Sequence, residues 1–430
     1  MHDSSVWEKR WQALEKTMER MSKRYGRLPN PTYKAVVECL KAFGASQFQF
    51  FNNGFQQGRL VPSMEYPAEY TLRTTLDQVG DDLSLIERAV DQRAHGSAAM
   101  KETLDKADRL AQEAINLAVE GGLLNGHKPT VITYFNKSAE VRMIPYAPVA
   151  LVGVPFTAMA VAQDFLAIPH EVGHYVYRHT LGLAAELDAL MPLQPAYQRP
   201  WMEEIFADVY GCLVAGPVMG LDFQDLFLDD SLEDFVGDDG DHPVEALRPD
   251  LYTSVLTELG FPVAAEALNR RWAERLVKRG SPSTFVPYGE FGEVALDDAR
   301  AELEKAAGKV LQHLEKVHKV RQSDPAGYWS EELKNGAEVE SLYRAFANRA
   351  SSPPDVIVPQ LRDLGDKVGI VEGNSEPTNV RYKGKTGTWI DWMKKPSNDN
   401  GPYGVSSSIW VPILTGGGWT TKGPEGGWPP

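Results

Sequence analysis

His170-Glu171-Val172-Gly173-His174, near the middle of the chain, decides how its surroundings fold. On an α-helix, residues four apart lie about 40° apart around the axis, so both imidazoles can reach one metal ion. Glu171 stands beside the first histidine, where its carboxylate can act on a metal-bound water. The apolar neighbours, with Gly173 leaving room for another backbone, indicate a buried helix. The stretch therefore predicts a metal-binding helix that supports metal-assisted hydrolysis.

A second helix is expected about 30 residues further on, in Trp201–Gly211. Glu204 and Asp208 fall at i and i+4 on one face, and the other positions are largely apolar. A two-histidine zinc site needs a third protein ligand, and Glu204 is the predicted one. Asp208 is predicted to accept the ring N–H of a ligating histidine and so fix its tautomer. Glu203 is the rival ligand, but it lacks a carboxylate one turn ahead on its own face.

A third motif, His242-Pro243 followed by Arg248, completes a series that resembles a known family. The three motifs, in this order and spacing, are similar to those of the gluzincin metallopeptidases. They most resemble the family of CAAX-prenyl proteases and HtpX-like heat-shock proteases, in which Glu-x-x-Ala-Asp-x-x-Gly matches Glu204–Gly211. The resemblance covers roughly residues 130–255.

The resemblance implies a role for each matching residue. His170, His174 and Glu204 would bind one zinc ion per chain, and Glu171 would be the general base. His242 together with Arg248 would face the developing oxyanion.

The residues before the first motif are expected to form strands. Members of that family often span membranes, but the long uncharged run Met143–Gln163 contains three prolines, which argue against a lipid-exposed helix. Strands are predicted at Val131–Phe135 and Val149–Val154. In gluzincins the strand before the active-site helix commonly forms the edge of the cleft. A peptide substrate is therefore expected to bind at Val149–Val154 by strand addition.

The composition narrows the class of protein. The 430 residues are 43% hydrophobic and 24% charged, with a mean hydropathy of −0.33, enough for a large core and several domains. The net charge of −15 argues against nucleic acid and anionic membranes as partners. Cys39 and Cys212 are the only cysteines and give no disulfide framework. Without an apolar signal region at Met1–Trp7, a cytoplasmic location is expected.

Apolar stripes at helical spacing predict helices on both sides of the motifs, including Trp7–Met21, Leu104–Leu117 and Leu296–Val320. The predicted fold class is therefore α+β, mainly helical, with a small sheet beside the zinc-binding helix. His313 and His318 are five residues apart, which predicts different helix faces and surface positions for both. Four regions are expected: a helical region at 1–126, the metallopeptidase core at 127–255, a helical region at 256–350 and a tail at 351–430.

The tail combines a predicted hairpin at Arg381–Trp389 with a stretch rich in Gly, Pro and Trp. Five tryptophans in the last 42 residues indicate a segment that packs against something. They are Trp389, Trp392, Trp410, Trp419 and Trp428. Three uses remain open: a β module that stabilises the enzyme, an autoinhibitory segment lying in the cleft, or a docking arm for a partner.

The function expected from these features is that of a zinc-dependent endopeptidase acting on a peptide or protein substrate. One alternative is an exopeptidase, which needs a charged anchor for a free chain terminus. Another is a protein-interaction scaffold whose zinc site is structural or vestigial. The intact Glu171 argues against the scaffold, because a structural zinc site does not require it.

Overall fold

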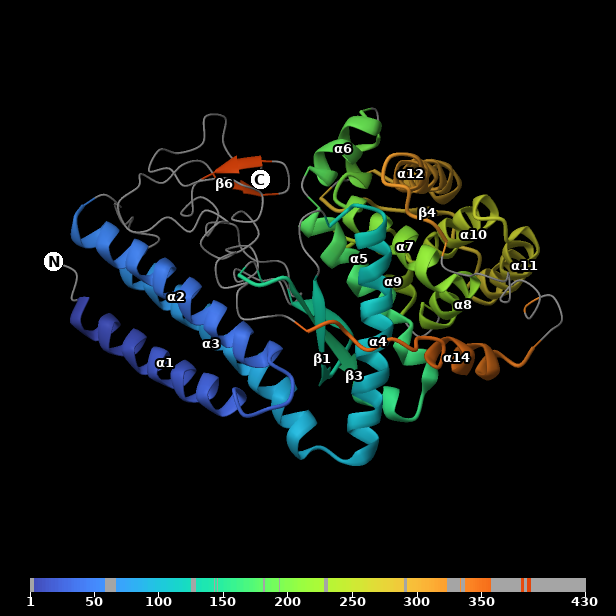
Figure 1. Ribbon diagram of the computed structural model, residues 1–430. Coiled ribbons are helices and arrows are strands. Elements are labelled where there is room, and N and C mark those ends of the chain that lie inside the picture. The colour runs from blue at the N-terminus through green and yellow to red at the C-terminus, as the bar shows by residue number, and fades with distance from the viewer. Residues whose placement is uncertain are drawn as a thin grey trace.

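Helices make up most of the described chain, and a small sheet lies among them (Figure 1). The computed structural model describes residues 4–58, 67–124, 129–142, 144, 146–180, 182–192, 194–227, 231–289, 292–322, 333, 337–356, 380–382 and 385–387. The mainly helical α+β fold predicted from the sequence is confirmed.

The elements have the following bounds. The strands are β1 (Thr130–Asn136), β2 (Glu140–Arg142), β3 (Val149–Pro155), β4 (Thr284–Phe285), β5 (Val294–Ala295), β6 (Val380–Tyr382) and β7 (Lys385–Gly387). The longer helices are α1 (Ser4–Tyr25), α2 (Thr32–Gln56), α3 (Ala68–His95), α4 (Ala98–Glu120), α5 (Ala167–His179), α7 (Met202–Ala215), α10 (Arg248–Glu258), α11 (Pro262–Lys278) and α12 (Leu296–Lys316). The shorter ones are α6 (Leu183–Leu190), α8 (Pro217–Leu226), α9 (Leu232–Phe235) and α14 (Val339–Ala347). Short 3-10 turns are η1 (Phe156–Met159), η2 (Ala162–Phe165) and η3 (Ala196–Gln198).

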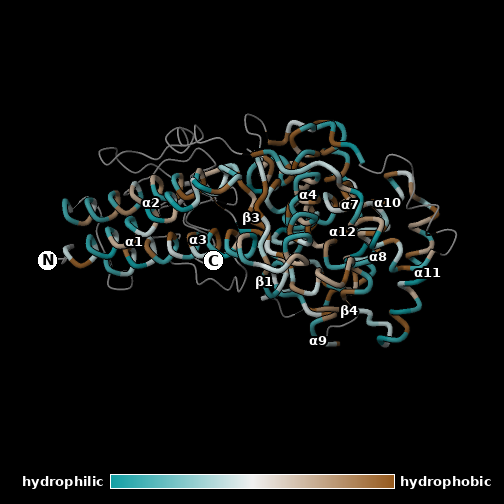
Figure 2. Tube along the Cα trace, turned by 60° about the horizontal axis from the view of Figure 1, so that its bottom comes forward, coloured by the Kyte–Doolittle hydropathy of each residue, from teal (hydrophilic) through white to brown (hydrophobic). Residues whose placement is uncertain are grey.

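The three N-terminal helices α1, α2 and α3 pack side by side and extend away from the sheet (Figure 1). Apolar and polar stretches alternate along α1 and α2 (Figure 2), as expected of helices with one buried face. Trp7, Trp11, Met18 and Met21 of α1 are buried, in agreement with the predicted stripe.

The central sheet has the strand order β1-β3-β2. β1 runs parallel to β3, with Val131 opposite Ala150, and β2 runs antiparallel, with Val141 opposite Val152. Both β1 and β3 are buried along nearly their whole length, because α3 and α4 pack on β1 and α5 packs on β3. The expectation that Val149–Val154 forms the cleft edge is wrong, since neighbours occupy both sides of β3. Within the described residues, the sheet edge that contacts α5 is β2.

Two ion pairs, one largely and one fully buried, fix the helices to this sheet. Arg93 of α3 binds Asp108 of α4 at 2.6 Å and donates to the carbonyl of Thr133 in β1 at 2.6 Å. Arg142 of β2 binds Asp82 of α3 at 2.7 Å, with both side chains almost fully shielded from water. Because a buried charge without its partner is costly, these pairs specify where α3 and α4 meet the sheet.

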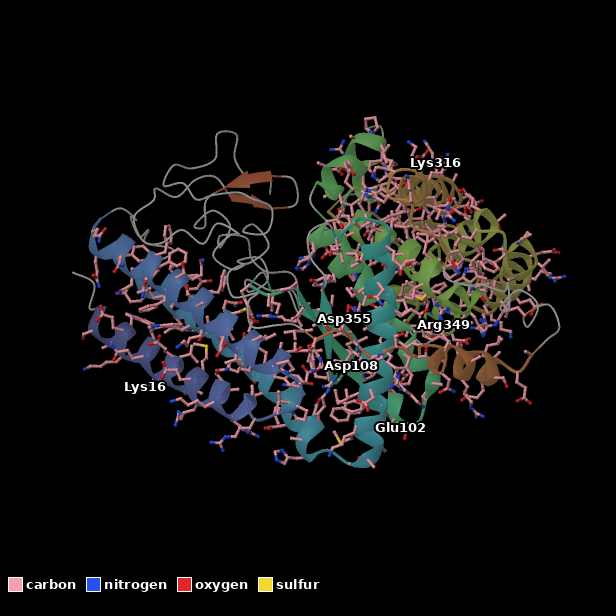
Figure 3. All side chains as sticks on the ribbon, viewed as in Figure 1. Lys16, Glu102, Asp108, Lys316, Arg349 and Asp355 are labelled. Carbon is pink, nitrogen blue, oxygen red and sulfur yellow. The ribbon has the colours of Figure 1, made fainter. Side chains whose placement is uncertain are left out.

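The last part of the described C-terminal region returns to the centre of the molecule. Arg349, after α14, binds Glu113 of α4 and donates to the carbonyl of Val214 in α7. The hydroxyl of Thr130 in β1 donates to the carbonyl of Asp355. Figure 3 shows Arg349 and Asp355 beside α4. Residues 349–355 therefore connect α14 with α4, α7 and the sheet.

Strands β6 and β7 pair antiparallel, with Val380 opposite Gly387, where the sequence predicted a hairpin. The tryptophans of the tail, from Trp389 onward, lie outside the described residues. In the part of the chain that is described, no helix is both long and apolar enough to cross a membrane.

The helices α5 and α7 make the closest contact between elements around the predicted metal site. A Cβ atom added to Gly173 of α5 would lie 2.8 Å from Cα and 3.2 Å from the carbonyl oxygen of Ala207 in α7. Only glycine permits this approach, as the sequence predicted for Gly173. The contact places the histidine-bearing face of α5 directly against the acidic face of α7.

We expect Gly173→Ala to destabilise the protein by about 1–3 kcal/mol, because the added methyl group meets backbone atoms that cannot move independently. Thermal unfolding followed by circular dichroism measures the effect. Gly80→Ala in α3 is the matched control, since nothing lies within 4 Å of its added Cβ. That variant should be neutral or slightly stabilised. Equal melting temperatures for the two variants would show that α5 and α7 do not approach this closely.

Candidate metal centre

Two helices bring the three predicted metal ligands together. His170 and His174 lie one turn apart on α5, and Glu204 lies in the first turn of α7. All three residues are largely buried, and their ligand atoms lie within 4.8 Å of one another. Pro169 is tolerated because it stands in the first turn of α5, where a missing N–H breaks no helical hydrogen bond.

The separations of the ligand atoms match those around zinc. Nε2 of His170 lies 3.1 Å from Nε2 of His174. Oε2 of Glu204 lies 3.3 Å from Nε2 of His170, and Oε1 of Glu204 lies 3.3 Å from Nε2 of His174. Ligand atoms at the corners of a tetrahedron lie about 3.3 Å apart when each is about 2.0 Å from the metal. The three groups therefore fit a zinc ion and leave the fourth position open.

Each histidine faces a carboxylate on its other ring nitrogen. Nδ1 of His170 lies 3.0 Å from Oδ1 of Asp208, and Nδ1 of His174 lies 3.1 Å from Oε1 of Glu203. A carboxylate accepts a hydrogen bond from a ring N–H in such a position, so with a metal ion bound each Nδ1 would carry the hydrogen and each Nε2 would offer a lone pair. Two lone pairs and the carboxylate of Glu204 then converge on one buried point, and only a cation makes that arrangement favourable.

The pKa values of His170 and Glu204 also indicate that this point favours a positive charge. Burial disfavours a charged His170, but Asp208 and Glu204 outweigh burial and raise the pKa of His170 to about 10. Burial likewise opposes the charged form of Glu204, yet the imidazoles of His174, His242 and His170 hold its pKa well below the usual range. Without a metal ion, a proton supplies the missing positive charge. A divalent cation would replace that proton.

Glu203 is placed to orient a ligand. Its Oε1 accepts a hydrogen bond from Nε of Arg178 at 2.6 Å as well as facing His174. Arg178 lies one turn after His174 on α5, so the carboxylate is held between two groups of the same helix. The sequence offered Glu203 only as a rival ligand. Its orienting position, and that of Arg178, depends on the approach of α5 and α7.

Arg248 differs from its predicted position at the oxyanion. Its guanidinium is buried, with Nε 2.6 Å from Oδ2 of Asp208 and an Nη atom 2.9 Å from Oε2 of Glu204. The rings of Phe223 and Phe227 lie 5.2 and 5.4 Å from it. The predicted role at the oxyanion is therefore corrected: Arg248 lies behind the metal ligands and balances the charge of two carboxylates.

Asp208 has a further partner that the sequence did not indicate. The hydroxyl of Tyr252 in α10 donates to Oδ1 of Asp208. Burial works against the charged form of Asp208, but Arg248 and the contact with His170 keep its pKa below the usual range. Asp208 is thus a permanently charged acceptor for the ring of His170.

Glu171 has the chemistry of a partly buried proton acceptor. It follows His170 on α5, and burial raises its pKa above the usual range. The charges of His174 and His170 oppose this rise, whereas those of Glu204 and Glu140 add to it. A carboxylate with a raised pKa is a stronger base than an ordinary one, which suits it to taking up a proton.

His242 lies at the exposed side of the centre. Its side chain is 46% exposed, and its Nε2 lies 3.4 Å from Oε1 of Glu204. Asp239 fixes the ring, since its Oδ2 lies 2.6 Å from Nδ1 and its Oδ1 accepts the backbone N–H of His242 at 2.8 Å. The same contacts lower the pKa of Asp239 to about 2 despite its partial burial. Asp239 was missed, although an Asp three residues before a functional His is a signal that sequence alone can supply.

The chain matches no protein-family model, no curated protein and no solved structure. The geometry of its own residues is therefore what any assignment of function depends on.

The burial of Arg248 leads to a test of its position. In the metal-free protein, Arg248→Met should lower the free energy of unfolding by about 3–5 kcal/mol, because Asp208 and Glu204 lose their buried counter-charge. Arg73→Met is the matched control, since Arg73 and Asp77 form an exposed pair and should contribute at most about 1 kcal/mol. Chemical denaturation measures both. An Arg248 variant as stable as the control would return this residue to the oxyanion role.

Proposed function

We propose that this protein is a zinc-dependent endopeptidase that hydrolyses peptide bonds in a peptide or protein substrate. The observation that carries the proposal is the convergence of two imidazole lone pairs and a carboxylate beside a second, basic carboxylate. His170, His174 and Glu204 would hold one zinc ion, and Glu171 would act as the general base. A purely structural zinc site has no use for the open fourth position or for Glu171.

The mechanism follows from the placement of the side chains. When bound, zinc lowers the pKa of water and polarises the carbonyl of the scissile bond. Glu171 takes a proton from the attacking water and delivers it to the leaving amine, for which its raised pKa suits it. His242, held by Asp239 at the exposed side, donates a hydrogen bond to the oxyanion as it forms.

The sheet suggests how the substrate binds. Among the described strands, β2 has one neighbour, β3, and β2 is also in contact with α5. An extended peptide that pairs with the other edge of β2 would run along the metal-binding helix. Backbone pairing of this kind suits a substrate that continues on both sides of the cleaved bond.

An exopeptidase of the same class is the alternative that a specific observation favours. Glu140 of β2 is charged and close enough to raise the pKa of Glu171. Its Oε1 accepts a hydrogen bond from the hydroxyl of Tyr134 at 2.7 Å. A carboxylate in this position could bind a free amino terminus. Cleavage of peptides with a blocked amino terminus distinguishes the two, because an aminopeptidase would leave them intact.

The second alternative is an interaction scaffold in which the zinc site is structural or vestigial. It predicts zinc binding without turnover on any peptide. We further propose a cytoplasmic location, with which the free, buried thiol of Cys212 is compatible.

Glu171→Gln should retain zinc and lose hydrolysis, because the amide preserves shape and cannot accept the proton. Elemental analysis and turnover on a peptide library give the two readouts. Glu102→Gln, at the exposed start of α4 (Figure 3), is the control and should keep both. Retained turnover in Glu171→Gln would exclude the proposed mechanism and leave the scaffold as the better account.

His242→Phe should lower kcat by about 10²–10³ while KM changes little, as for the loss of one oxyanion donor. Phenylalanine keeps a ring of similar size without a donor, and the change lies at a half-exposed side chain outside the core. Steady-state kinetics on one peptide substrate provide the measurement. A change confined to KM would assign His242 to substrate binding.

A further inference from the structure

A second cluster of metal-binding side chains lies outside the centre described above. It consists of Glu186 in α6, His313 in α12 and His318 just after α12, whose ligand atoms lie within 4.8 Å of one another. The sequence predicted separate faces and surface positions for the two histidines. That expectation is wrong, because α12 ends at Lys316 and the chain then turns back.

The turn after α12 brings the two rings together. The backbone N–H groups of Val317 and His318 both donate to the carbonyl of His313, and Lys319 has a positive φ of 54°. A positive φ reverses the chain at a helix end. The ring centroids of His313 and His318 lie 5.1 Å apart at 76°, close to the 4.7 Å and 90° of His170 and His174.

Glu186 supplies the negative charge between the two rings. Its Oε2 lies 2.9 Å from Nε2 of His313 and 3.5 Å from Nε2 of His318. These separations bracket the roughly 3.3 Å between ligands of a tetrahedral zinc ion. The Nε2 atom of His318 is shielded from water and has no hydrogen-bond partner among the described residues. A buried nitrogen in this state is destabilising unless something binds it.

The surroundings hold the cluster in place and leave it reachable. Nζ of Lys309 donates to the carbonyl of Leu190, which fixes the end of α6 against α12. Figures 1 and 3 show α6 beside α12, with Lys316 at the same end of the molecule. The side chain of Glu186 is 45% exposed, so an ion can enter from solvent.

We propose that Glu186, His313 and His318 form a second zinc site, which fastens α6 to the end of α12. Two imidazoles and one carboxylate form a ligand set that binds zinc in preference to calcium or magnesium. Since α6 follows α5 after a short connection, the bound ion would also fix the end of the helix that carries His170 and His174. The proposal does not depend on peptidase activity.

Zinc counting tests the proposal on the full chain. Protein stripped with a chelator is titrated with zinc chloride, freed of unbound metal and analysed for its zinc content. We expect two zinc ions per wild-type chain and one in either Glu186→Gln or His318→Ala. His174→Ala should also hold one, and the double variant His174→Ala/His318→Ala none. His95→Ala, which removes an exposed histidine of α3, is the control and should hold two.

Two further readouts separate this site from the candidate metal centre. In His174→Ala, cobalt should still give the visible absorption of a bound ion, and zinc should still raise the melting temperature. Both effects should vanish when Glu186→Gln is added, a change at a half-exposed side chain that leaves the core intact. A single zinc in the wild type that His174→Ala removes, or two in both Glu186→Gln and His318→Ala, would overturn the second site. Neither result would bear on hydrolysis at the first.

Discussion

The close approach of α5 and α7 is the constraint on which the rest of the site depends. Because Gly173 has no side chain, the backbone of Ala207 occupies the space that a Cβ atom at position 173 would need. At that distance the first turn of α7 faces two turns of α5, so Glu204 reaches both imidazoles. Glu203 and Asp208 reach their outer nitrogens from the same helix. One helix contact therefore determines the ligand set and the groups that orient it.

Charge balance explains why so many ionisable groups can be buried at this contact. Each histidine faces a carboxylate, and each of those carboxylates faces an arginine: Asp208 binds Arg248, and Glu203 binds Arg178. A buried carboxylate with such a partner stays charged, and its contact with Nδ1 turns the Nε2 atom of each histidine toward the point where a metal would bind. The remaining uncompensated charge lies at the point where a metal would bind.

The contacts around α5 also link the candidate metal centre to the rest of the molecule. The edge strand β2 lies along α5 and is tied to α3 by the ion pair of Arg142 with Asp82. The C-terminal end of α5 leads into α6, whose Glu186 contacts the two histidines at the end of α12. The neighbours of α5 are thus held by polar contacts with distant segments, which favours a rigid site over one assembled on binding.

The sequence by itself determined the helical periodicity, the mainly helical α+β class, the strands and the identity of the residues that converge, because spacing of three to four or of two residues is a local property. It also predicted that Gly173 leaves room for the backbone of a neighbouring element. It could not determine that β3 is central, that Arg248 lies behind Glu204, or that Glu203 orients His174, since these depend on which elements become neighbours. The contact between His313 and His318 was not predicted for a related reason. Helical spacing places the two residues on different faces, and only the reversal of the chain at Lys319 brings their rings together. Local pattern specifies which face a side chain occupies on its own element, and tertiary packing alone decides what that face meets.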